Sequence, residues 1–222
     1  MYNLLFHDTS INSGFLGTQA EKYKISKLIF FRIINIFKGE KQSKEIALTF
    51  DDGGESINSK LIKQIIPYFK VKIFISTKYI NNKGFLSPVE IKKLHELGVT
   101  IGSHSHSHKK FKFNQNKSFI NDWTKSKIIL ENIIGDKVEN CSIPYGLYDE
   151  WQLKKLYEMG FKKIYTSDPK PINFIDDIFT KPRIPVDSRL FKFELYIIKI
   201  FRIKYLYTKH LIYFNLKKFI YG

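Results

Sequence analysis

The sequence of 222 residues predicts a single domain with an α/β fold and a largely parallel sheet. Short apolar runs alternate along the chain with segments whose apolar residues recur at helical spacing, which is the pattern of strand–helix–strand units. We find no internal repeat and no second domain boundary in this alternation. The 43% of hydrophobic residues is enough for one domain of barrel or doubly wound size.

Seven strands are expected, each from a short run of apolar and β-prone residues. They lie at residues 2–6, 45–50, 71–76, 99–102, 139–143, 161–166 and 178–186. The stretches 9–18 and 39–44 are polar and predict loops.

Five helices are expected between these strands, at residues 23–37, 58–69, 87–98, 118–134 and 150–160. Asn58 is suited to cap the second of them, and Ser87 to Glu90 forms a capping box with proline at the first helical position. Glycines follow the third, fourth and fifth helical patterns and predict their ends. Asp187 is suited to cap a further helix at the C-terminus.

Composition restricts the function only loosely. Lys+Arg 37 against Asp+Glu 21 gives a net charge of +16, which suits nucleic acid, an anionic membrane surface or an acidic glycan. The chain is also rich in Lys, Ile, Asn and Phe and poor in Ala, a bias that genome base composition produces, so the charge is weak evidence for any one partner. The single cysteine, Cys141, excludes an internal disulfide. The first residues lack the pattern of a signal peptide and no apolar run reaches transmembrane length, so we expect a cytoplasmic protein.

The apolar run 46–50 ends in Asp51-Asp52-Gly53-Gly54. Adjacent side chains of an extended segment point to opposite sides, so the two carboxylates are expected to do different things. Two like charges this close repel each other, which favours a site where a cation neutralises at least one of them. The alternative is a strand that ends in an ordinary Asp-Gly turn.

Other polar residues also follow the ends of expected strands. These are His7, the run from His104 to His108, and Tyr145. In a parallel barrel the carboxyl ends of the strands converge on one face, so residues distant in sequence would meet in one pocket. His104 and His108 have the spacing that puts two imidazoles on one side of a helical turn. With one carboxylate they would bind a divalent cation and leave positions open on it, whereas the alternative is a solvated histidine loop.

The segments Thr49–Gly53 and His104–His108 resemble the first two motifs of the polysaccharide deacetylases, carbohydrate esterase family 4 or the NodB homology domain. The resemblance implies a distorted parallel (β/α) barrel. It implies that Asp51 is the catalytic base and that Asp52, His104 and His108 bind a divalent metal, with Zn²⁺ expected first and Co²⁺ or Ni²⁺ as alternatives. His106 falls on a variable position of the second motif and is expected to be a loop or packing residue.

The third family motif is kept in part. Pro144, Tyr145 and Gly146 match it, but Ser142 occupies the place of its arginine. The resemblance implies that the backbone N–H of Tyr145 helps to hold the oxyanion. Arg183, in a later expected strand, is the candidate for the missing guanidinium, and an ordinary surface arginine is the alternative.

The fourth family motif is matched only poorly, by Ser167-Asp168 after the expected strand, and the fifth is not found near the C-terminus. Leu4-Leu5-Phe6-His7 instead resembles the last motif, as in a branch of the family whose last strand is permuted to the N-terminus. The resemblance then implies that His7 is the general acid, oriented by Asp8. The alternative is a histidine that caps the first strand.

Residues 1–189 are therefore expected to form the deacetylase-like barrel and 190–222 a basic, aromatic-rich helical segment. That segment is suited either to lie on an anionic membrane or to close the barrel as an ordinary helix.

The expected function is a metal-dependent hydrolase that removes an N-acetyl group from an amino sugar. Its substrate would be a glycan or a lipid-linked glycan precursor, encountered at the inner face of the membrane. The alternative is a catalytically impaired relative that keeps the fold and binds metal and glycan. A nucleic-acid binder is the third reading, and no regular stacking or groove-binding motif in the chain favours it.

Overall fold

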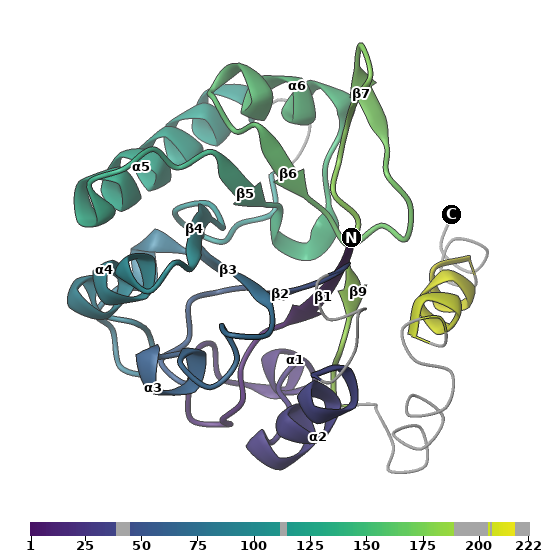
Figure 1. Ribbon diagram of the computed structural model, residues 1–222. Coiled ribbons are helices and arrows are strands. Elements are labelled where there is room, and N and C mark those ends of the chain that lie inside the picture. Colours follow the sequence, from purple (N-terminus) through teal and green to yellow (C-terminus); the bar gives the residue numbers. More distant parts are fainter. Residues whose placement is uncertain (39–44, 112–114, 189–203, 205, 216–222) are drawn as a thin grey trace.

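The computed structural model describes residues 1–38, 45–111, 115–188, 204 and 206–215, and it has the expected α/β architecture (Figure 1). Seven strands form one sheet in the order β6-β5-β4-β3-β2-β1-β9, and every neighbouring pair is parallel. The strands are β1 (Tyr2–Phe6), β2 (Ile46–Phe50), β3 (Lys70–Ile75), β4 (Thr100–Ser103), β5 (Asn140–Ser142), β6 (Lys163–Tyr165) and β9 (Ile184–Pro185). The sheet curls into a half-barrel with helices around its outside, which confirms a distorted (β/α) barrel.

Among the described residues, five of the six helices around the sheet overlap predicted helices, and α1 was not predicted. They are α1 (Thr18–Glu21), α2 (Lys27–Phe37), α3 (Ser59–Ile62), α4 (Pro88–Glu96), α5 (Asn116–Ile134) and α6 (Glu150–Glu158), with short 3₁₀ turns η2 (Thr77–Tyr79) and η3 (Pro144–Gly146). Ser87 caps α4 and Gly135 ends α5 in a left-handed conformation, as the capping patterns predict.

Two predicted helices are longer in the sequence pattern than in the structure. The pattern at 58–69 yields only the four residues of α3, capped by Asn58, because Pro67 has no N–H and the backbone bonds before it alternate between i−3 and i−4 acceptors. The pattern at 23–37 begins only at α2, where the Ser26 hydroxyl accepts from the Ile29 N–H. In both segments apolar side chains of the predicted stripe are buried although part of the backbone is not α-helical. Leu61 and Ile65 show this in the segment 58–69.

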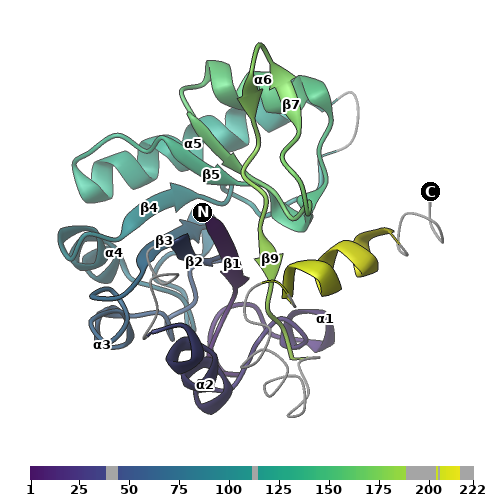
Figure 2. The same ribbon diagram turned by 45° about the vertical axis from the view of Figure 1, so that its right-hand side comes forward.

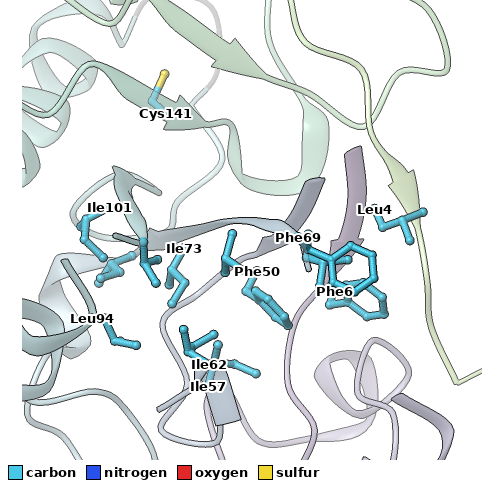
Figure 3. Packing of buried hydrophobic residues seen from close by; sticks show 14 of the residues in the cluster. Leu4, Phe6, Phe50, Ile57, Ile62, Phe69, Ile73, Leu94, Ile101 and Cys141 are labelled. Atoms are coloured by element: carbon cyan, nitrogen blue, oxygen red, sulfur yellow. The ribbon is translucent and has the colours of Figure 1, made fainter. Parts of the chain in front are cut away.

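The strands have two distinct faces. In β2, Ile46, Leu48 and Phe50 belong to the hydrophobic core between sheet and helices (Figure 3), whereas Ala47 and Thr49 face the inside of the half-barrel. The same alternation directs Phe74 of β3 inward, where its ring packs 5.0 Å from that of Tyr165 of β6. Residues that continue the inner series beyond the strand ends therefore point into the carboxyl-end opening of the half-barrel.

The prediction of one strand at residues 178–186 is wrong, because these residues form two separate short strands. Its first part, β8 (Ile178–Phe179), pairs antiparallel with β7 (Asn173–Ile175) in a separate hairpin that the sequence did not predict. Its second part, β9, is parallel to β1. Lys181 lies between them and exchanges backbone hydrogen bonds with Ile164 and Thr166 at β6. Pro182 cannot donate to a ladder, so the segment changes partner there and links both edges of the half-barrel (Figure 2).

The expected C-terminal segment is described only in part, at residues 204 and 206–215, and its remainder, like the helix proposed to begin at Asp187, lies outside the described residues. Residues 206–215 are helical, with Leu206 buried and Tyr207 edge-on to Tyr2 of β1. Within the described part of the chain, no helix combines the length and apolar character needed to cross a bilayer.

Candidate active site

Asp51 continues the inner face of β2 and ends in a buried ion pair. Both of its carboxylate oxygens accept from Arg183, at 2.6 Å and 2.9 Å, and the Ser142 hydroxyl donates to Oδ2 at 3.1 Å. Burial alone would raise the pKa of Asp51, but the Arg183 guanidinium outweighs it and holds that pKa well below its usual range. Asp51 is therefore a fixed carboxylate at the carboxyl end of the sheet.

Arg183 is itself held from two sides. Its Nε–H donates to the Thr166 carbonyl and Nη2 donates to Ser142 Oγ at 2.8 Å. The guanidinium lies 5.6 Å from the ring centroid of Phe74, which closes the inside of the half-barrel beneath it. A Cβ at Gly102 would lie 2.5 Å from that ring, so glycine at this position makes room for Phe74.

Asp52, His104 and His108 form a second cluster next to Asp51. One potential ligand atom from each lies within 4.8 Å of the others. Asp52 Oδ1 is 3.5 Å from His104 Nε2 and 3.3 Å from His108 Nε2, and within the described structure this buried oxygen accepts no hydrogen bond. A buried carboxylate oxygen without a donor, between two imidazole nitrogens, fits a divalent cation such as Zn²⁺.

His104 is prepared for ligation by its neighbour. Its Nδ1 lies 2.8 Å from the Ser142 carbonyl, which leaves Nε2 with the lone pair that faces Asp52. Burial lowers the pKa of His104 to about 4, against the pull of Asp51, so the imidazole is neutral over the physiological range.

The two histidines do not lie on a helical turn, as their spacing suggested. Residues 104–108 form an irregular loop in which Ser105 and His108 have positive φ, and this loop brings the two rings to 4.9 Å between centroids. Asp122 of α5 accepts from the N–H groups of His106 and Ser107 and fixes the loop. His106 points to Thr77, with Nδ1 2.9 Å from its hydroxyl, and is no part of the cluster.

Backbone strain is concentrated here. Of the six described non-glycine residues with positive φ, four belong to this site: Asp52, Ser105, His108 and Tyr145. Such conformations cost about 1–3 kcal/mol each and are typical of functional sites. Tyr145 is 54% exposed on the rim, its ring centroid lies 4.8 Å from that of His108, and its hydroxyl donates to the His108 carbonyl.

His7 lies at the end of the neighbouring strand. Phe6 and Phe50 are register partners and the Asp51 N–H donates to the Phe6 carbonyl, so His7 emerges beside Asp51 on the inner face. The positive charge of a protonated His7 contributes to lowering the pKa of both Asp51 and Asp52. Its ring packs against Tyr23, with 4.9 Å between centroids.

Asp8 is not the orienting partner that the sequence suggested. It is 1% exposed and accepts from the hydroxyls of Ser13 and Ser56, and no described hydrogen bond joins it to His7. Because neighbouring residues at the end of β1 point to opposite sides, Asp8 faces away from the inner face that His7 follows.

The sequence also matches a known protein family. The sequence model of the family described as polysaccharide deacetylase matches residues 38–164, more than half of the chain. The chain belongs to the polysaccharide deacetylase family. Among curated relatives of this family is YxkH of Bacillus subtilis (strain 168), 26% identical over 127 residues that make up 57% of this chain. The match covers 46% of YxkH, so the chain spans about half the length of this relative.

Solved deacetylase structures share the fold over most of the chain. IcaB from Ammonifex degensii superposes with a TM-score of 0.68 at 17% identity, covering 85% of this chain and 92% of that one. A de-N-acetylase from Aggregatibacter actinomycetemcomitans gives a TM-score of 0.67 at 16% identity, covering 89% and 98%. At such low identity these likenesses establish the fold alone and say nothing of the roles of individual residues.

Sequence reasoning named the acidic pair, His7, the two outer histidines, the Pro144–Gly146 turn and Arg183, and the structure gathers them at one end of the sheet. It missed Ser142 as a partner of Asp51, because serine was considered only as a lost arginine. It also missed Phe15, whose ring centroid lies 4.8 Å from that of His108. No sequence pattern marks Phe15, since it lies in a polar loop.

Proposed function

We propose that the chain is a metal-dependent hydrolase that removes the N-acetyl group from an amino sugar of a glycan. The observation that carries this proposal is the buried Asp52 Oδ1 without a hydrogen-bond donor, placed between His104 and His108 and adjacent to Asp51. A pure binding protein would have no use for a second carboxylate fixed by Arg183 beside that cluster.

Asp52, His104 and His108 would hold the divalent ion, Zn²⁺ being the first expectation and Co²⁺ or Ni²⁺ the alternatives. When bound there, such an ion makes water acidic and polarises an amide carbonyl. Asp51 accepts the proton of the attacking water, and its low pKa keeps it ionised for this task. Arg183 and Ser142 keep the carboxylate oriented.

The other half of the reaction falls to Tyr145 and His7. The Tyr145 N–H, in the strained Pro144–Gly146 turn, donates to the oxyanion that develops on the acetamide oxygen. His7, across from this turn at the end of β1, gives its proton to the departing amine. None of the five other histidines is better placed. His104 and His108 would hold the ion, and His106, His210 and His95 contact Thr77, the Ser167 carbonyl and Asp136 respectively.

The finer substrate class is also a proposal. The exposed Lys204 and Lys209 of the C-terminal helical region and the overall charge of +16 support a lipid-linked sugar at an anionic membrane surface, such as the inner membrane face of a cytoplasmic enzyme. The same helix packs through Leu206 and His210 against the barrel, which equally suits a helix that closes the domain. The domain division at residue 189 rests on this composition.

A catalytically impaired glycan-binding relative is the second candidate, because the third family motif lacks its arginine and the later motifs match weakly. Acetate release from N-acetylglucosamine oligomers and from a lipid-linked N-acetyl sugar, with the Zn²⁺-loaded chain, separates the two. Hydrolysis that is lost in Asp51→Asn but kept in Asp149→Asn, a helix cap of α6, is the expected result. Bound Zn²⁺ with no acetate released from any of these glycans would contradict the enzyme.

A further inference from the structure

A buried polar cluster beside the site has no part in the roles above. Asp8 is 1% exposed, and its Oδ1 accepts from Ser13 Oγ at 2.8 Å and from Ser56 Oγ at 2.9 Å. Ser13 belongs to the loop 9–17 after β1, and Ser56 belongs to the loop that follows the Asp51-Asp52 pair. One carboxylate therefore joins two loops of the active-site face.

Two glycines let the backbone approach this carboxylate closely. A Cβ at Gly14 would lie 2.1 Å from Asp8 Oδ2, and a Cβ at Gly54 would lie 2.0 Å from Oδ1. Any side chain at these positions would displace the carboxylate. Asp8 fits here only because both neighbouring residues are glycine.

Further bonds hold the loop 9–17 in place. The Ser56 N–H donates to Ser13 Oγ at 2.8 Å, and the Gly14 N–H donates to the Gly84 carbonyl at 2.6 Å. Lys24 is 5% exposed, and its ammonium donates to the carbonyls of Ile11 and Ser13. The loop is thus fixed from one side by a buried carboxylate and from the other by a buried ammonium.

This arrangement fixes the position of Phe15, which follows Gly14 in the chain. Its ring centroid lies 4.8 Å from that of His108, 4.6 Å from that of Tyr79 and 5.1 Å from that of Phe85. Phe15, Tyr79 and Phe85 are only partly buried, so their rings form an apolar wall beside His108, a candidate metal ligand. We call Phe15, Tyr79 and Phe85 the aromatic wall.

We propose that Asp8 is a positioning residue that anchors the loop 9–17 and so holds Phe15 against His108, where the aromatic wall receives one face of the substrate sugar ring. A pyranose ring has an apolar C–H face that packs well on rigid aromatic surface, and such surface at a site mouth contributes to substrate affinity rather than to the chemical step. The proposal rests on the proposed deacetylase function, because it needs an ion on His108 and a glycan at the wall.

The first test measures where Phe15 lies. Phe15→Trp introduces an indole next to the metal cluster, and Co²⁺ bound to the chain should quench its fluorescence. The parent chain, measured in the same way, gives the signal of Trp123 and Trp151, which is subtracted. Asp8→Ala in this background should reduce the quenching at least about twofold, since the loop is no longer anchored. Asp149→Ala removes a carboxylate outside the loop 9–17, the N-cap of α6, and should leave the quenching unchanged.

The second test uses kinetics. Asp8→Ala and Phe15→Ala should each raise KM for an N-acetylated oligosaccharide about tenfold with kcat little changed, because both remove uniform binding. The double variant should behave like either single variant, since both act through one contact. Asp8→Asn, which can still accept from the two serines, should recover part of the affinity.

The outcomes distinguish a failure of the proposed metal-dependent function from a failure of the role proposed for Asp8. A chain that binds no Co²⁺ and quenches no introduced indole contradicts the metal site and this inference with it. Co²⁺ quenching that persists in Asp8→Ala, or that falls equally in Asp149→Ala, overturns the inference while the deacetylase function stands. If Asp8→Ala does not fold, Ser56→Ala removes one donor to Asp8 and is measured in the same two tests.

Discussion

Arg183 and Asp51, 132 residues apart in the chain, form a two-pronged ion pair in which both side chains are at most 4% exposed. Ser142, at the position where the family motif has arginine, contacts both members of the pair. We propose that Arg183, in the segment before β9, supplies the guanidinium that the third motif lacks at β5. A short side chain at position 142 leaves the space that Arg183 fills.

Arg183→Met should leave Asp51 as a buried carboxylate without its main partner. We expect a loss of about 3–5 kcal/mol of folding free energy, because an uncompensated charge remains buried. The pKa of Asp51 should rise, so the acidic limb of the pH–rate profile should move to higher pH. Chemical denaturation and the pH dependence of kcat/KM measure the two effects.

A matched variant tests the relocation directly. Arg183→Ser combined with Ser142→Arg restores the family arrangement and should recover part of the activity lost in Arg183→Met. An unchanged pH–rate profile in Arg183→Met would show that the guanidinium does not control the base.

His7→Gln should reduce kcat for an N-acetyl sugar by about 10²–10⁴-fold, the usual contribution of a general acid. An acetate ester with a nitrophenolate leaving group needs no proton on departure and should be hydrolysed nearly as before. The ratio of the two rates measures the role of His7, and bound metal per chain serves as the control. Equal losses on both substrates would assign His7 a structural role instead.

Metal removal should destabilise the chain. Zn²⁺ in 100-fold excess over its dissociation constant adds about 2.7 kcal/mol to the free energy of unfolding. For a domain of this size that corresponds to a rise of about 5–10 °C in Tm. Calorimetry with and without chelator measures it, and Asp52→Asn should abolish the shift whereas Asp149→Asn should keep it. A full shift in Asp52→Asn would place the ion elsewhere.

The stability of the metal-free chain should depend on pH through Asp8. Burial raises the pKa of Asp8 from 3.8 to about 6, although Ser13 and Ser56 oppose the rise. Between these values the folded chain binds more protons at this site than the unfolded chain, so the contribution of Asp8 to stability falls as pH increases from about 4 to 6 and is constant above. Two pKa units correspond to about 3 kcal/mol.

Asp8→Asn removes this titration. As pH increases from about 4 to 6, the free energy of unfolding of the parent chain should therefore fall relative to that of Asp8→Asn. Urea denaturation of both chains at several pH values measures this difference. A difference that is constant from pH 4 to 7 would mean that Asp8 titrates normally.

The sequence by itself determined the parts of this protein that depend on local pattern. Apolar runs and helical periodicity located six of the seven strands of the main sheet, all but β9, because burial of one face imposes a period on the chain. The acidic pair and the spaced histidines identified the candidate metal cluster, because few residue types bind a divalent cation.

Tertiary structure decided what depends on distance through space. Only the half-barrel shows that Arg183 meets Asp51, since the segment around Pro182 changes partner from β6 to β1. Only the loop conformation shows that Asp8 turns from His7 to Ser13 and Ser56 and that Phe15 reaches His108. These contacts join residues whose separation in the chain carries no period, and close packing around them fixes which pairs meet.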